Sequence, residues 1–119
     1  RAVTHYTEAL RQHPQNPLGR YNLAVALANR GRYHEAVAEL ETADRLARLY
    51  LENGHAGYRA RALVYEQHDP GRAIMSWERY ASSLNAISNP TLFQAAEARN
   101  ARARLTWLKK NRLNGADPQ

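Results

Sequence analysis

Histidine, glutamate and serine are the residues of this chain that could act in catalysis or bind a metal. His34 and Glu35 begin like the zinc-protease motif, but Ala38 stands where the second histidine of the i, i+4 pair is needed. The five histidines are scattered over different segments, and the chain has no cysteine. No base and orienting group stand near the candidate nucleophiles in the sequence, which are Ser76, Ser82 and Ser83. We therefore predict that the chain is not an enzyme and holds no metal or cofactor.

The composition predicts a helical protein. The chain has 119 residues, enough for one domain or part of one. It is rich in alanine, leucine and arginine and has almost no β-branched runs, a balance that favours helices over strands. Because it begins at Arg1 without a methionine, we expect it to be a piece of a longer protein. The fold class predicted from composition is all-α.

The charge balance points to two explanations that the sequence leaves open. The formal net charge is +6, and the excess comes mostly from arginine. Arginine bias is typical of GC-rich bacterial genomes, and it also favours attraction to acidic peptides or phosphate. The lack of cysteine is compatible with both cytoplasm and periplasm. No apolar run approaches the roughly 18 residues that span a bilayer, so we predict no membrane insertion.

Residues 16–47 predict two helices joined by a tight turn. Asn16 and Pro17 are a helix-start signal, because proline is tolerated in the first turn and fixes φ there. Gly31 ends the first helix, since glycine adopts a left-handed conformation at low cost. The apolar face of the first helix comprises Leu23, Ala24, Leu27 and Ala28. The face of the second comprises Tyr33, Ala36, Val37, Leu40, Ala43 and Ala47.

This stretch resembles a tetratricopeptide repeat, a helix–turn–helix unit of about 34 residues. With Pro17 as the first position, the family's marked positions fall on Leu23, Ala24, Leu27, Gly31, Tyr33, Ala36, Leu40 and Ala43. Arg20 stands where the family often has tryptophan, and Arg48 stands at the late proline. The resemblance implies a right-handed superhelical array of antiparallel helix pairs, an α-solenoid whose common role is protein binding.

The same pattern predicts the domain organisation. Residues 1–16 match the second helix of a repeat, so the chain should open on an apolar edge that something upstream covers. Residues 17–53 form a repeat with a long second helix, Tyr33 to Asn53, and residues 54–87 form a degenerate repeat. Residues 88–113 predict a C-terminal capping helix, and 114–119 a flexible tail. The apolar residues of the capping helix are Leu92, Phe93, Ala96, Ala103, Trp107 and Leu108, which we expect to face the core.

The resemblance also implies a peptide-binding groove on the concave side, lined by the first helix of each pair. The expected groove residues are Tyr21, Asn22, Val25, Asn29, His55, Tyr58, Arg59, Ala62 and Tyr65. Asn22, His55 and Arg59 stand at positions where a subfamily holds the C-terminal carboxylate of a peptide, and an arginine fork suits a carboxylate. Tyr58 and Tyr65 also fit ordinary packing between helices.

A basic surface is expected on the last helix. Its residues are Arg99, Arg102, Arg104, Lys109, Lys110 and Arg112. A solvated cap face, an acidic partner or neighbouring subunit, and nucleic acid all fit this run, although no basic stripe with interleaved aromatics continues along the repeats. We predict a bacterial protein-interaction scaffold that binds a partner peptide or protein. The alternatives are a nucleic-acid-associated helical repeat and self-association through exposed helix edges.

Overall fold

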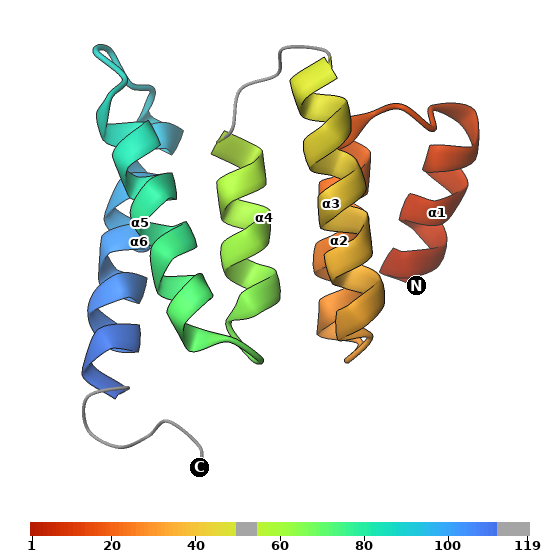
Figure 1. The fold of residues 1–119 in the computed structure, drawn as a ribbon. Helices are drawn as coiled ribbons and strands as arrows, with labels where there is room; N and C mark the ends of the chain where they lie inside the picture. Colours follow the sequence, from red (N-terminus) through yellow and green to blue (C-terminus); the bar gives the residue numbers. More distant parts are fainter. Residues whose placement is uncertain (50–54, 112–119) are drawn as a thin grey trace.

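The computed structural model describes residues 1–49 and 55–111, and helices account for most of them. These are α1 (Ala2–Gln12), α2 (Pro17–Asn29), α3 (Tyr33–Leu49), α4 (His55–Tyr65), α5 (Pro70–Asn85) and α6 (Leu92–Asn111). Consecutive helices run antiparallel, as Figure 1 shows. No strand occurs in the described ranges, and the all-α class with a repeat-like helical array is confirmed. The right-handed sense of the superhelix remains a prediction.

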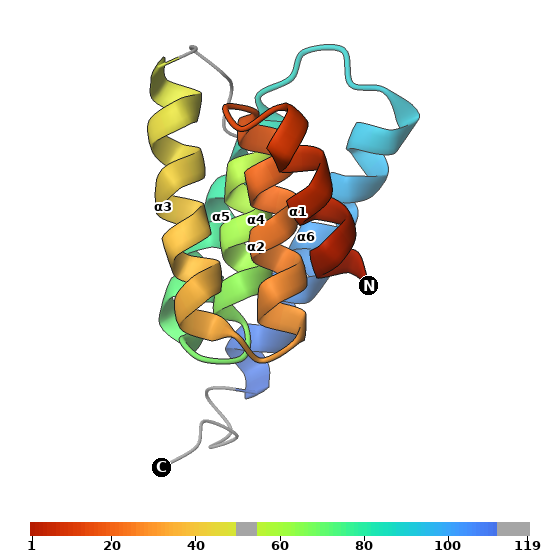
Figure 2. The same cartoon turned by 90° about the vertical axis from the view of Figure 1, so that its right-hand side faces the viewer.

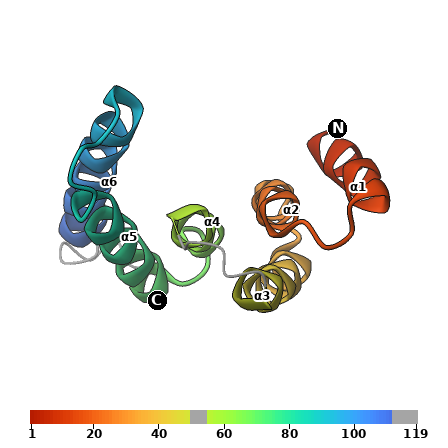
Figure 3. The same ribbon diagram turned by 90° about the horizontal axis from the view of Figure 1, so that it is seen from above.

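The helices form an arc that measures 45 × 41 × 24 Å. Helix α2 contacts α1, α3 and α4, while α5 lies between α4 and α6. Seen from above, α3 and α5 lie on one side of the arc, α2 and α4 along its middle, and α1 and α6 project on the other side (Figure 3). The side view agrees, with α3 at one edge and α6 at the other (Figure 2). Helix α4 therefore packs against α2 and α3 of the first pair and against α5 of the second.

The predicted start and stop signals of α2 are confirmed. The Asn16 Oδ1 atom accepts a hydrogen bond from the Leu18 N–H at 3.1 Å, and Pro17 is the first helical residue. Gly31 has φ 79°, the left-handed conformation that favours glycine. The Arg32 N–H donates to the Leu27 carbonyl at 2.9 Å across this residue. These contacts satisfy the last carbonyl groups of α2 and direct the chain into α3.

The last two helices also begin with side-chain caps. The Asp69 carboxylate accepts a hydrogen bond from the Arg72 N–H at 3.2 Å, and Pro70 is the first residue of α5. At α6, Thr91 and Gln94 cap each other: the Gln94 N–H donates to Thr91 Oγ1 at 3.0 Å, and the Thr91 N–H donates to Gln94 Oε1 at 2.9 Å. This reciprocal cap places the start of α6 just after Thr91.

Two apolar cores hold the array together. The first lies between α1, α2, α3 and α4, and the predicted faces of α2 and α3 supply most of it. The second joins α4, α5 and α6. Its buried members are Ala62, Trp77, Tyr80, Ala81, Leu84, Ala98, Ala101, Leu105 and Leu108. Because α4 contributes to both cores, it couples the first helix pair to the second.

The predicted core face of α6 is wrong. Ala98, Ala101, Leu105 and Leu108 face the core, and of these only Leu108 was expected to do so. Leu92 and Phe93 are 93% and 72% exposed, and Trp107 is 52% exposed. Helix α6 carries apolar residues on two faces, and periodicity does not tell which face the rest of the molecule covers. The predicted extension of the α3 helix to Asn53 and the tail at 114–119 lie outside the described residues.

Candidate functional site

A groove of about 520 Å³ lies between α4 and α6, with residues of α5 contributing to its lining. We name it the inner groove. It is lined by His55, Ala56, Arg59, Tyr80, Leu84, Phe93, Gln94 and Glu97. Helix α6, which supplies Phe93, Gln94 and Glu97 to this groove, projects to the same side of the arc as α1 (Figure 3). The groove combines apolar, aromatic and charged side chains, a mixture that suits a peptide.

Glu97 organises the charges of the inner groove. Its carboxylate lies 3.5 Å from the Arg59 Nε atom and accepts a hydrogen bond from the Tyr80 hydroxyl at 2.7 Å. Burial raises the pKa of Tyr80 above its usual range, and the hydrogen bond to Glu97 raises it further. Tyr80 therefore remains a neutral hydrogen-bond donor that fixes Glu97. The groove presents one cation and one anion side by side.

His55 is held in place by α5. Its Nδ1 atom lies 2.7 Å from Ser83 Oγ, and that hydroxyl donates its own proton to the Tyr80 carbonyl at 2.8 Å. Because the hydroxyl has only one proton, Nδ1 must be the donor to Ser83 Oγ. This assignment leaves Nε2 of the neutral ring as a hydrogen-bond acceptor. In this arrangement the serine proton points to the backbone carbonyl of Tyr80 rather than to His55.

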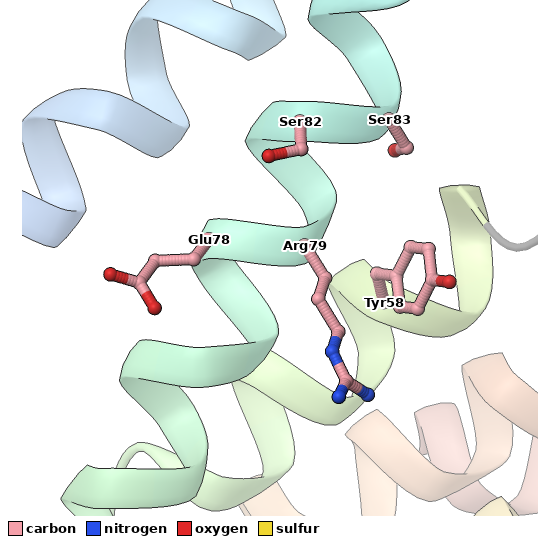
Figure 4. A pocket seen from close by; sticks show the side chains of 5 residues that line it. All are labelled: Tyr58, Glu78, Arg79, Ser82 and Ser83. Atoms are coloured by element: carbon pink, nitrogen blue, oxygen red, sulfur yellow. The ribbon is translucent and has the colours of Figure 1, made fainter.

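A second surface lies on the other side of α5, and we name it the outer groove. It consists of two hollows of about 410 and 200 Å³ that share Arg79. Figure 4 shows the larger hollow, in which Arg79 extends beside Tyr58 while Glu78 points away from both. The Arg61 guanidinium lies 5.6 Å from the centre of the Tyr58 ring, and Arg72 lies 5.7 Å from that of Tyr65. These arginines cover ring faces that a ligand would otherwise use.

The structure divides the predicted groove residues among the inner groove, the outer groove, the surface of α2 and the core. His55 and Arg59 line the inner groove, whereas Tyr58 and Tyr65 line the outer groove. On α2, Asn22 and Val25 are half-buried and Asn29 is exposed near the end of the helix. Helix α5 causes the division, because it packs against α4 between the two sets.

Two predicted groove residues belong to the core instead, which corrects the prediction. Ala62 has no exposed surface and packs in the second core, so it cannot contact a ligand. Tyr21 is buried in the first core, and its hydroxyl donates to Asp44 Oδ1 at 2.7 Å. Both lie on a helical face that neighbouring helices cover, which a pattern within one helix does not reveal.

Asp44 is a junction of three helices that the sequence did not indicate. Its carboxylate on α3 accepts the Tyr21 hydroxyl from α2 and a forked ion pair from Arg61 on α4. Burial raises the pKa of Tyr21 above its usual range, and the bond to Asp44 adds to the effect. The sequence shows only that Tyr21 and Arg61 lack a polar partner on their own helices, and it does not show that Asp44 is the partner of both. Asp44 fixes the angle between the first helix pair and α4.

The predicted basic surface on α6 is smaller than expected. Arg104 is bound to Glu66, the residue that follows α4, by two hydrogen bonds of 2.6 and 2.9 Å, and Lys109 lies 3.0 Å from Glu78 of α5. Arg102 donates to the Asn85 side chain at 3.2 Å. Arg99 and Lys110 meet no acidic side chain within residues 1–49 and 55–111, and Arg112 lies outside them. Acidic side chains outside α6 thus pair with two of the six expected residues, Arg104 and Lys109, which weakens the nucleic-acid alternative.

None of the helices in 1–49 and 55–111 has the length and apolar character needed to cross a bilayer. No group of three His, Asp or Glu side chains in these ranges lies close enough together to hold a metal ion.

A tetratricopeptide repeat model matches residues 5–38 of the chain. The match covers the later part of α1, the whole of α2 and the beginning of α3. It includes six of the predicted marked positions, namely Leu23, Ala24, Leu27, Gly31, Tyr33 and Ala36. Comparison with curated proteins and with solved structures found no match. The predicted resemblance is confirmed: this chain carries a tetratricopeptide repeat within an all-α helical array.

Proposed function

We propose that the chain is a protein-interaction module that binds an extended or helical segment of a partner in the inner groove. The repeat family indicates such a module in general, and its members are commonly non-catalytic scaffolds. The specific support is the side chain of Phe93, which is 72% exposed at the edge of the groove. Exposed phenylalanine beside a groove is a common anchor point in protein interfaces.

The charges of the groove define the segment that it suits. Arg59 already faces Glu97, so a peptide carboxylate would have to compete with Glu97 for the guanidinium. A segment with an apolar side chain against Phe93 and Leu84, flanked by polar groups, meets no such competition. The His55 Nε2 atom adds an acceptor for a backbone or side-chain N–H donor. We therefore base the proposal on apolar anchoring, with Arg59 and Glu97 setting the orientation.

A displayed peptide library tests this function. The library is selected on the folded chain alone, and the selected peptides are then measured against the Phe93→Ser variant, which changes only an exposed side chain. We expect peptides that bind the parent chain at least about tenfold more tightly than Phe93→Ser, a difference of about 1.4 kcal/mol. Trp107→Ser is the matched control, since Trp107 is also an exposed aromatic of α6 but does not line the groove. Peptides that bind both parent and Phe93→Ser equally would contradict the proposal.

A further inference from the structure

Helix α6 has a second apolar stripe on the face opposite its buried one. Leu92, Ala96, Ala103 and Trp107 are spaced by four, seven and four residues, which places them on one helical face. The buried face of α6 is formed by different residues, as described above. Among the described residues, Leu92 is the most exposed large apolar side chain. We name this exposed face the α6 stripe and include in it the cations Arg99 and Lys110, which the same spacing places there.

Helix α2 shows what such a pattern means in this fold. It too carries apolar residues around its circumference, and Tyr21, Leu23, Ala26 and Leu27 are all buried. That burial is possible because α1, α3 and α4 all pack against α2. Among the described helices, α6 packs mainly against α5. The apolar residues of α6 therefore occupy two faces of the helix, as in a helix covered on two sides, but only one of these faces is covered.

The shape of the α6 stripe favours a helix as the covering element. Its largest side chains stand at the two ends, and alanines at 96 and 103 lie between them. Small residues at the centre allow another helix to approach closely and cross there. At the C-terminal end, the Arg104 guanidinium lies 4.6 Å from the centre of the Trp107 ring, which holds the indole in a defined position.

The charges of the stripe define the chemistry of the partner. Neither Arg99 nor Lys110 faces a carboxylate in the part of the chain that the structure describes, whereas Arg104 and Lys109 do. A partner helix with acidic residues beside its apolar stripe would complement both cations. A second copy of this chain would bring the same cations against each other, and the chain as a whole carries a net charge of +6.

We propose that the α6 stripe docks an amphipathic α-helix of another protein, one with acidic residues flanking its apolar face. This surface is separate from the inner groove, since Phe93 and Glu97 line the groove whereas Leu92, Ala103 and Trp107 do not. The chain then has two binding surfaces, one for a segment in the groove and one for a helix on the back of α6.

The test uses a synthetic helical peptide with a leucine–alanine stripe flanked by glutamates, and a matched peptide with lysines in their place. The ¹⁵N-labelled chain has two indole N–H signals, one from exposed Trp107 and one from Trp77, which is buried and donates to Glu66 at 2.8 Å. We expect the acidic peptide to shift the Trp107 signal and leave that of Trp77 in place. The lysine peptide should bind at least about tenfold more weakly.

Variants separate this surface from the inner groove. Leu92→Ser and Arg99→Glu change exposed side chains and should each weaken binding of the acidic peptide by about three- to tenfold. Arg30→Glu makes the same charge change at an exposed site outside the stripe and should leave binding within about twofold after allowance for long-range charge. Phe93→Ser should also leave it unchanged. Circular dichroism of each variant confirms that the helices are retained.

Four outcomes would overturn the proposal. Chemical-shift changes gathered at His55 and Arg59 would place the peptide in the inner groove and leave the proposed function intact. Equal weakening of binding by Arg30→Glu and Arg99→Glu would show unspecific charge attraction. Binding of anionic phospholipid vesicles that shifts Trp107 fluorescence, without binding of the peptide, would identify a lipid surface as the occupant. A dimer in sedimentation that Leu92→Ser dissociates would identify a second copy of the chain as the occupant.

Discussion

Gly57 on α4 touches the side chain of Tyr21 on α2: a Cβ atom at Gly57 would lie 2.8 Å from the Tyr21 hydroxyl oxygen. That hydroxyl is held at 2.7 Å from Asp44 Oδ1, so it is not free to move aside. Asp44 also binds Arg61, one turn further along α4. The close approach and the two bonds together set how the second helix pair packs on the first. This relationship positions α4, and α4 carries His55 and Arg59 into the inner groove.

Gly57→Ala should therefore destabilise the fold. Alanine is a better helix former than glycine by up to about 1 kcal/mol, but overpacking a filled site costs about 1–3 kcal/mol. We expect a net loss of about 1–2 kcal/mol in the free energy of unfolding, because Tyr21 can move only by breaking its bond to Asp44. Urea denaturation followed by circular dichroism measures the change.

Gly19→Ala is the matched control for this prediction. Its added Cβ would lie 3.2 Å from Leu10 Cδ2 and 3.3 Å from Asn16 Nδ2, the ends of side chains that can shift. The higher helix propensity of alanine should then prevail, so that Gly19→Ala leaves the free energy of unfolding unchanged or raises it by up to about 1 kcal/mol. Equal effects of the two substitutions would mean that the Gly57–Tyr21 contact does not constrain the fold.

Glu66 should contribute strongly to the second core. It directly follows α4 and accepts hydrogen bonds from the Trp77 indole at 2.8 Å and from the Arg104 guanidinium, so its carboxylate ties the end of α4 to both α5 and α6. Glu66→Gln keeps the shape of the side chain but removes its charge. The new NH₂ group cannot accept the hydrogen bonds that the replaced carboxylate oxygen accepted from Trp77 or Arg104. We expect a loss of about 1–3 kcal/mol, reduced from the value of a buried pair because Arg104 is partly exposed.

Glu41→Gln provides the comparison for Glu66. Glu41 is exposed and meets no cation among the described side chains, so its substitution should stay within about 0.5 kcal/mol of the parent chain. The two variants lose the same charge, which separates local bonding from the effect of net charge. A loss for Glu66→Gln no larger than that for Glu41→Gln would show that the junction does not stabilise α6.

Stability should fall at alkaline pH because of Tyr21 and Tyr80. Burial, and hydrogen bonds to Asp44 and Glu97, raise the pKa of both tyrosines in the folded chain. Their stabilisation is complete below the unfolded pKa of about 10 and is lost as the pH rises from there toward the folded pKa. In that window the unfolded chain binds fewer protons, so each tyrosine lowers the free energy of unfolding by about 1.4 kcal/mol per pH unit.

Tyr21→Phe isolates one of these two contributions. At pH 8 it should cost about 0.5–1.5 kcal/mol through the lost hydrogen bond to Asp44. Above pH 10 the slope of stability against pH should be shallower than in the parent chain by about 1.4 kcal/mol per unit. Urea denaturation at a series of pH values gives both numbers. An unchanged slope would mean that Tyr21 ionises equally in the folded and unfolded chains.

The helices and their turns could be predicted from the sequence because their signals are local. Asn16, Pro17 and Gly31 act on neighbouring backbone groups, and the apolar spacing of α2 and α3 identifies the faces that are buried. The face of α6 could not be chosen in this way. It has apolar residues on two sides, and only the position of α5 decides that Ala98 and Leu105 are covered while Leu92 is not.

The candidate site was predicted only in part, for a similar reason. His55 and Arg59 share a groove because α4 presents them on one side of α5. Phe93, Gln94 and Glu97 were missed as groove residues because they come from α6, which lies far from α4 in the sequence. Arg104 has no acidic partner on its own helix, because its partner Glu66 lies in the turn between α4 and α5. Contacts between distant segments carry no pattern that a single sequence displays.

Mapping of a library-selected peptide by NMR tests the central claim, that the inner groove binds a partner segment. The ¹⁵N-labelled chain is titrated with the peptide and shift changes are followed residue by residue. Our account predicts the largest changes at His55, Arg59, Phe93 and Gln94, with loss of binding in Phe93→Ser. Changes centred on Tyr58 and Arg79 would place the ligand in the outer groove and contradict the account.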